Sequence, residues 1–126
     1  MQGTVRRLDR SAEFATAERC FIVEVSNSDA DPHLSIARAR VAAGATTRWH
    51  RLDGVVERYA IVEGRGRVEI GDAAPEDVGP GDVVLVPAGC RQRIANTGGV
   101  DLVFLAICTP RFRPEAYVDI EGGSAE

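Results

Sequence analysis

The sequence contains no lysine, and all 15 of its basic residues are arginines. With a formal net charge of -4, the chain lacks the basic surface that binding to nucleic acid phosphates requires. The arginines are spread along the chain rather than gathered in one run, so the sequence does not indicate a polybasic patch for a membrane surface. We therefore expect neither nucleic acid nor a membrane as a partner.

Long apolar runs and paired cysteines are also missing. Residues 1–10 are rich in charge and hold no apolar stretch of the kind that signal peptides contain, and no segment reaches transmembrane length. Cys20, Cys90 and Cys108 are widely separated and form no CxxC pair, which is typical of a reducing compartment and of small buried side chains. We expect a cytoplasmic protein.

What the chain has in quantity is β-branched residues, with 15 valines and seven isoleucines among its 126 residues. Short runs of strand length, bounded by residues that favour turns, occur at 20–26, 33–42, 56–62, 66–71, 82–86, 90–95 and 101–108. No helical period lies between them, so a parallel α/β sheet lacks its crossover helices. The pattern predicts an all-β antiparallel sandwich or barrel, built as one domain over 1–126 with a core at about 20–108.

The two ends of the chain differ from this core. Residues 11–19 predict a short helix before the barrel, with Ser11 as its N-cap. After Cys108, two prolines within 109–114 remove the donors that a central strand needs. The tail 109–126 is therefore expected to run extended over the barrel or onto a partner subunit, and its apolar Phe112 and Tyr117, which need cover, suggest a homodimer.

Two segments carry a pattern of glycine, histidine, glutamate and proline at fixed spacings. The first is GATTRWHRLDGVVERYAIVEG, residues 44–64, and the second is GDVVLVPAGCRQRIAN, residues 81–96. In both their order and their short separation, these segments resemble the two motifs of the cupin family, over roughly the central half of the chain. The resemblance implies a double-stranded β-helix, also called a jelly-roll barrel, of the small single-domain type that commonly forms homodimers.

The alternation of side chains in strands predicts an interior pocket from the same two segments, independently of the family resemblance. Residues two apart in a strand share a face, so His50, Glu57 and Gln92 lie on the apolar side of their strands, while the arginines beside them point outward. A buried polar group without a partner costs about 1–3 kcal/mol. The three side chains are therefore expected to meet in one interior pocket, where their partners are one another, water, a metal or a ligand.

In metal-binding cupins the resemblance implies four ligands, namely two histidines one residue apart, a glutamate, and a histidine of the second motif. The matching positions here are His50, Leu52, Glu57 and Gln92. Leu52 has no donor atom, and a neutral amide oxygen is a weaker ligand than imidazole for Zn, Fe, Ni or Cu. His50, Glu57 and Gln92 can still hold a divalent metal, Mn included, on one face, with open positions for water or substrate.

Three interpretations of this pocket follow from the residues. In the first, a divalent metal on His50, Glu57 and Gln92 polarises a small oxygenated substrate, and the resemblance to cupins implies lyase, isomerase or oxygenase chemistry. In the second, no metal is bound, and His50 and Glu57 act as a general base with its orienting carboxylate or as contacts for a ligand, with Tyr59 as a proton donor. In the third, the polar groups only satisfy one another in a barrel that binds or scaffolds without catalysis.

We expect three further residues to lie on the barrel exterior. Arg38 and Arg40 alternate with small residues that are expected to face the core, which places both guanidinium groups in solvent. Trp49 points away from the pocket if His50 points into it, and so covers the exterior or a subunit contact.

Overall fold

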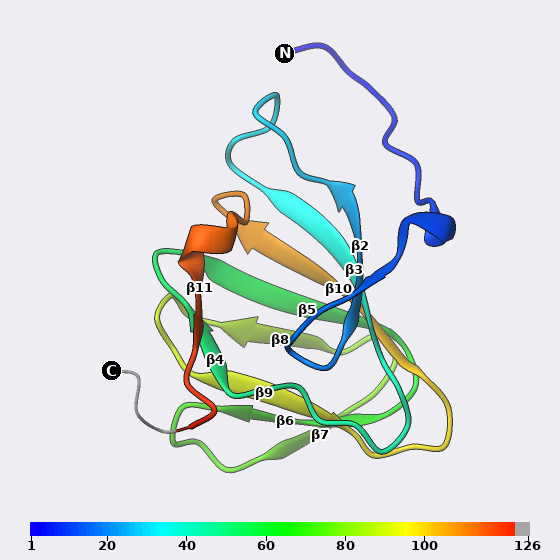
Figure 1. Cartoon of the computed structure of the whole chain (residues 1–126), viewed down its shortest axis with the longest axis vertical. Coiled ribbons are helices and arrows are strands. Elements are labelled where there is room, and N and C mark those ends of the chain that lie inside the picture. The colour runs from blue at the N-terminus through cyan, green and yellow to red at the C-terminus, as the bar shows by residue number, and fades with distance from the viewer. Residues whose placement is uncertain (123–126) are drawn as a thin grey trace.

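The computed structural model describes residues 1–122, and in it two antiparallel sheets face each other as a double-stranded β-helix (Figure 1). The larger sheet has the order β1-β2-β3-β10-β5-β8, and the smaller has the order β11-β4-β9-β6-β7. The strands of the larger sheet are β1 (Phe14–Ala15), β2 (Phe21–Ser26), β3 (Ser35–Val41), β10 (Leu102–Thr109), β5 (Val56–Glu63) and β8 (Val83–Val86). Those of the smaller sheet are β11 (Tyr117–Asp119), β4 (His50–Leu52), β9 (Gln92–Asn96), β6 (Gly66–Ile70) and β7 (Glu76–Val78). The all-β prediction is confirmed.

All seven predicted strand runs form strands, and their side chains alternate as expected. In β5, for example, Glu57, Tyr59 and Ile61 are buried while the residues between them are more exposed. The turns depend on glycine where the backbone enters the left-handed region. Gly64 is the tightest case, because its φ is +85° and an added Cβ would lie 2.4 Å from the carbonyl oxygen of Asp101.

The predicted helix over 11–19 is wrong. The chain forms a 3-10 helix only at Arg10–Ala12 and then continues into strand β1, which pairs with β2. The Glu13 carboxylate binds the guanidinium groups of Arg38 and Arg40, so contacts with the barrel override the weak helical signal. Residues 1–122 contain no helix that is long and apolar enough to cross a membrane.

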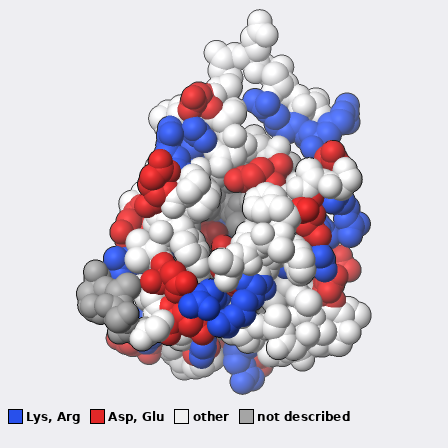
Figure 2. All heavy atoms as spheres, in the orientation of Figure 1, with Lys and Arg blue, Asp and Glu red and all other residues white. Residues whose placement is uncertain are grey.

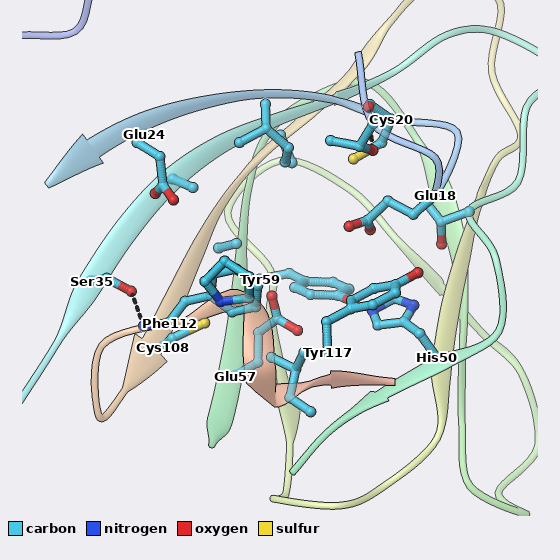
Figure 3. A pocket seen from close by; sticks show the side chains of 18 of the residues that line it. Glu18, Cys20, Glu24, Ser35, His50, Glu57, Tyr59, Cys108, Phe112 and Tyr117 are labelled. Atoms are coloured by element: carbon cyan, nitrogen blue, oxygen red, sulfur yellow. Dashed lines mark hydrogen bonds between the residues drawn. The ribbon is translucent and has the colours of Figure 1, made fainter. Parts of the chain in front are cut away.

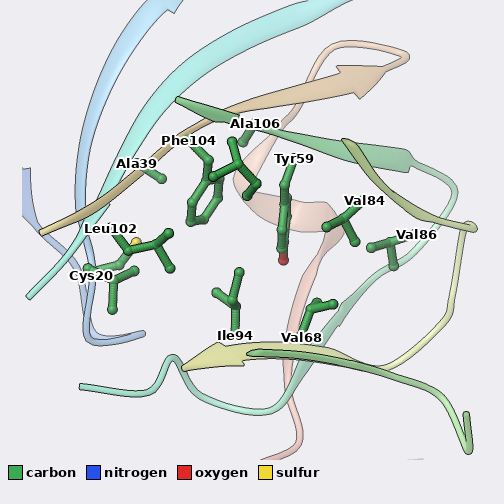
Figure 4. Close-up of a cluster of buried hydrophobic side chains, with 12 residues drawn as sticks. Cys20, Ala39, Tyr59, Val68, Val84, Val86, Ile94, Leu102, Phe104 and Ala106 are labelled. Carbon is green, nitrogen blue, oxygen red and sulfur yellow. The ribbon is translucent and has the colours of Figure 1, made fainter. Parts of the chain in front are cut away.

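The barrel is closed at one end by a packed apolar core (Figure 4). Leu102 and Val41 face each other there across strands β10 and β3, and both are fully buried, as is Ile94 on β9. Toward the other end the paired inward positions become smaller, from Phe104 with Ala39 to the two alanines of the next pair, Ala106 and Ala37. The interior therefore empties along the same two strands.

The tail runs over the barrel of its own chain, which is one of the two paths predicted for it; the other was onto a partner subunit. Strand β11 pairs with β4, and Tyr117 and Phe112 pack against a small buried cluster that contains Leu52 and Val55. Because the chain itself covers both aromatic residues, they no longer argue for a partner subunit. The homodimer stays a prediction, and the part of the tail at 123–126 lies outside the described residues.

The outward-facing arginines are less solvated than predicted. Arg38 is 7% exposed and Arg40 is half-buried, because Glu13 of the N-terminal segment covers and pairs with both of them. Trp49 does lie outside the pocket, with its ring between the guanidinium groups of Arg91 and Arg93, 4.6 and 4.5 Å from their central carbons. The interpretation of Trp49 as an exterior residue is confirmed.

Candidate functional site

Both sheets contribute to an interior cavity of about 340 Å³, which opens at the end of the barrel opposite the packed core. Its wall is largely apolar, with side chains from strands β1, β2, β3, β4, β5, β10 and β11 and from the segments that connect β1 to β2 and β10 to β11. The larger apolar members are Phe14, Ile22, Leu52, Phe104, Phe112 and Tyr117. Figure 2 shows a hollow near the centre of this face of the molecule, with acidic side chains beside it.

His50 lines the cavity from β4 and is 4% exposed. Its Nδ1 lies 2.7 Å from the carbonyl oxygen of Arg48, which can only accept, so Nδ1 carries the proton of the neutral ring. Nε2 is then the acceptor of the ring. The Tyr117 ring stacks on the imidazole, with centroids 5.1 Å apart, and holds its orientation.

Glu57 lines the cavity from β5 and is the most unusual group in it. Its side chain is buried, and its Oε1 finds no hydrogen-bond partner among residues 1–122. Burial, and to a smaller extent the nearby Glu18 carboxyl, raises the pKa of Glu57 to about 8, although a hydrogen bond with Gln92 opposes the shift. Without a ligand, Glu57 is therefore mostly a neutral acid at pH 7.

Tyr59 and Gln92 form a pair in the barrel interior. The Tyr59 hydroxyl donates to Oε1 of Gln92, and the Tyr59 ring packs on Phe104 with centroids 4.5 Å apart. Burial raises the pKa of Tyr59 well above its usual range, so its hydroxyl stays protonated. Tyr59 lines the cavity, whereas Gln92, 1% exposed, is not among the described residues that line it.

The structure thus places the predicted residues together but divides their roles. His50 and Gln92 are paired residues of β4 and β9, and Glu57 lies across the interior on β5. His50, Glu57 and Tyr59 reach the cavity, and Gln92 supports Tyr59 and Glu57 from behind. The roles assigned to these residues in catalysis and metal binding stay predictions.

Sequence reasoning missed Glu18, which enters the cavity from the segment between β1 and β2 (Figure 3). A tight turn holds this segment: Thr16 donates twice to the carbonyl of Cys20, Arg19 has a φ of 68°, and the Glu18 carbonyl accepts from the Arg48 N–H. Burial raises the pKa of Glu18. No local pattern distinguishes Glu18 from a solvent-exposed acidic residue, so only the folded chain shows its position.

The donor atoms do not fit the metal that the family pattern implies. Leu52, at the second ligand position, is packed with Val55 and Cys108. Oε1 of Gln92 already accepts a hydrogen bond from the Tyr59 hydroxyl. Burial favours the neutral form of Glu57, which is a poor ligand. Over residues 1–122, no three side chains of the His, Cys, Asp or Glu type lie close enough together to hold a metal ion.

The fold and the cavity together define a class, the double-stranded β-helix barrels with a ligand-sized interior. Comparison with known families gives the same result, because the family described as Cupin domain matches residues 37–108, which is more than half of the chain. The chain belongs to the cupin family.

Individual relatives add little about activity. An uncharacterized protein from Methanocaldococcus jannaschii, MJ1618, is 33% identical over 81 residues, and the match covers 64% of each chain. Among solved structures, KdgF from Halomonas sp. has a TM-score of 0.75 at 16% identity, covering 86% of this chain and 96% of that one. A predicted oxalate decarboxylase from Thermotoga maritima has a TM-score of 0.76 at 23% identity, covering 85% and 99%. At these identities, the two structures support the fold alone.

Proposed function

We propose that this protein binds a small, mostly apolar organic molecule inside the barrel without using a metal. The observation that carries the proposal is the cavity itself, whose volume of about 340 Å³ falls within the range of small-molecule sites. An apolar wall supplies affinity through burial of the ligand, and a few polar groups at fixed positions orient it. This is the second of the three interpretations of the pocket.

His50 and Glu57 supply complementary polar contacts in this site. Nε2 of the neutral imidazole accepts a hydrogen bond, and the protonated carboxyl of Glu57 donates one. A ligand that offers one donor and one acceptor satisfies both groups. The same pair has the composition of a general base and a general acid, so a proton transfer on the bound molecule is compatible with the site.

The similarity to a predicted oxalate decarboxylase does not extend to a proposal of oxalate as the ligand. Oxalate is a dianion, and a buried anion requires cationic partners. None of the cavity-lining side chains within residues 1–122 is an arginine, and several are carboxylic acids, among them Glu18 and Glu57. We therefore propose a ligand that is not a carboxylate.

The test uses benzyl alcohol, a neutral ring compound that fits the cavity, and isotope-labelled protein observed by NMR. Binding is expected to shift the amide resonances of Ala37, Ala106 and Tyr117, which line the cavity. Ala37→Leu, which narrows the cavity, should reduce these shifts, and His50→Ala should weaken binding by removing the imidazole. Shifts confined to the outer surface, or unchanged in Ala37→Leu, would refute binding in the cavity.

Elemental analysis of protein purified without chelator tests the metal separately. We expect less than stoichiometric Zn, Fe, Mn, Ni and Cu. One divalent ion per chain, lost in His50→Ala, would instead support the first interpretation and refute a metal-independent site.

A further inference from the structure

The wall of the cavity carries acidic groups from several elements with little to balance them. Glu18, Glu24, Glu57 and Asp119 all line it, and among the described lining residues the only side chain that can become cationic is His50. Asp119 is paired with Arg48 at the rim, with 2.7 Å between Oδ2 and Nε. The deeper carboxyl groups of Glu18 and Glu57 have no such guanidinium partner within residues 1–122.

Glu57 is a polar group of this wall whose hydrogen bonding is not satisfied by residues 1–122. It is 9% exposed, its carboxyl group is directed into the cavity (Figure 3), and its Oε1 lacks a hydrogen-bond partner within residues 1–122. A buried acceptor without a partner costs about 1–3 kcal/mol. A ligand that brings a donor to this oxygen regains that cost on binding.

Glu18 faces the same space from the opposite wall. Figure 3 shows the two carboxyl groups entering the cavity from different elements, Glu18 from the segment before β2 and Glu57 from β5. Aromatic rings of Phe14, Phe112 and Tyr117 complete the surroundings. The two carboxyl groups, when ionised, and the faces of these rings attract a cation and repel an anion.

We infer that the cavity selects a small organic cation, an amine on a compact apolar body, whose ammonium group binds between Glu57 and Glu18. This inference rests on the proposed function, since it assigns a charge class to the ligand of that cavity. The ammonium group donates to the open Oε1 of Glu57, and its single positive charge balances the charge of that carboxylate beside the Glu18 carboxyl. The apolar body fills the space beside the aromatic rings.

Binding of a cation changes the protonation of the site. The titratable groups that face Glu57 from the elements around it are Glu18, Glu24, His50, Tyr59, Tyr117, Cys20 and Cys108. Since burial holds the pKa of Glu57 at about 8, an ammonium ligand that requires the carboxylate displaces its proton at neutral pH. The affinity for the amine should therefore rise as the pH increases toward 8.

The experiment compares three compounds of matched size, namely benzylamine, benzyl alcohol and benzoate, by calorimetry on the full chain. We expect benzylamine to bind about tenfold more tightly than benzyl alcohol, and benzoate to bind more weakly than either. Repeating the benzylamine titration in buffers of different ionisation enthalpy should reveal release of protons to the buffer.

Two variants and one control locate the effect. Glu57→Gln and Glu18→Gln should each reduce the ratio of the benzylamine affinity to the benzyl alcohol affinity to within about threefold. Glu115→Gln, at an exposed residue outside the cavity lining, should leave the preference unchanged. Glu18 lies on a connecting segment, so its variant keeps the test valid if Glu57→Gln fails to fold.

The outcomes separate this inference from the proposed function. Equal binding of benzylamine and benzyl alcohol, or tightest binding of benzoate, would overturn the cation preference and leave the cavity as a binding site. Failure of all three compounds to bind folded protein would overturn both. A preference for benzylamine that persists in both glutamine variants would also overturn the assignment to Glu18 and Glu57.

Discussion

The two ends of the barrel are built from the same strands and differ in what fills them. At the closed end, Leu102 and Val41 meet in a pair that excludes solvent completely. Two pairs further along β10 and β3, the facing residues are Ala106 and Ala37, and both line the cavity. Both pairs belong to the same antiparallel ladder, so the size of the side chains decides where the barrel is solid and where it is hollow.

This difference indicates that the residues that stabilise the fold and the residues that bind a ligand lie at opposite ends of the barrel. Burial of branched apolar side chains at the closed end contributes to folding, whereas the open end keeps buried carboxyl groups that oppose it. An interior of this kind should respond in opposite ways to substitution at its two ends.

The largest effect is expected from Leu102→Ala at the closed end. The side chain is fully buried, so its removal loses apolar burial and leaves a cavity, at a cost of about 3 kcal/mol in the free energy of unfolding. Urea denaturation followed by circular dichroism measures this cost. A loss below about 1 kcal/mol would mean that the closed end is not the stabilising part of the barrel.

A smaller effect of the opposite sign is expected from Glu57→Gln at the open end. Burial raises the pKa of Glu57 from 4.5 to about 8. Between these values the folded protein keeps a proton that the unfolded chain releases, so the free energy of unfolding of the native protein falls as pH rises through this window. The variant lacks this loss and should gain on the order of 2 kcal/mol relative to the native protein by pH 8.

Denaturation of both proteins at a series of pH values from 5 to about 8 tests the prediction. The difference in the free energy of unfolding should widen steadily with pH, while the exposed Glu115→Gln control keeps a constant difference from the native protein. A difference independent of pH would show that the Glu57 carboxyl is not held neutral by burial.

The smallest effect on stability is expected from Ala37→Leu. The added side chain enters open space in the cavity, so the free energy of unfolding should change by less than about 1 kcal/mol. Binding of benzyl alcohol should nevertheless weaken. A destabilisation as large as that of Leu102→Ala would indicate that the two ends are packed alike.

Much of the fold could be predicted because the signals were local. The alternation of apolar and polar residues predicted strands such as β5 and placed His50, Glu57 and Gln92 in the barrel interior. The two motifs indicated the type of barrel. The strands that were not predicted, including β1 and β11, have two or three residues, which is too short for an alternating pattern. They form because neighbouring strands offer unpaired edges.

The site was less predictable than the fold because contacts between distant parts of the chain position several of its residues. His50 and Glu57 could be found from strand alternation, but the position of Glu18 depends on a turn held by backbone contacts with Cys20 and Arg48. The interaction of Gln92 with Tyr59 likewise depends on the distance between two sheets. The sequence pattern contains neither the geometry of this turn nor the distance between the sheets.

More than half of the residues that line the cavity lie outside the segment 37–108 that identifies the family. They belong to two terminal stretches, one ending with Ser35 at the start of β3 and the other after β10, which fold back to form the wall with Glu18 and Tyr117. Chains that share the barrel and differ in these stretches can therefore differ in ligand while keeping every residue by which they are recognised as related. For this protein, exchange of the terminal stretches between relatives offers a direct route to altered selectivity on an unchanged scaffold.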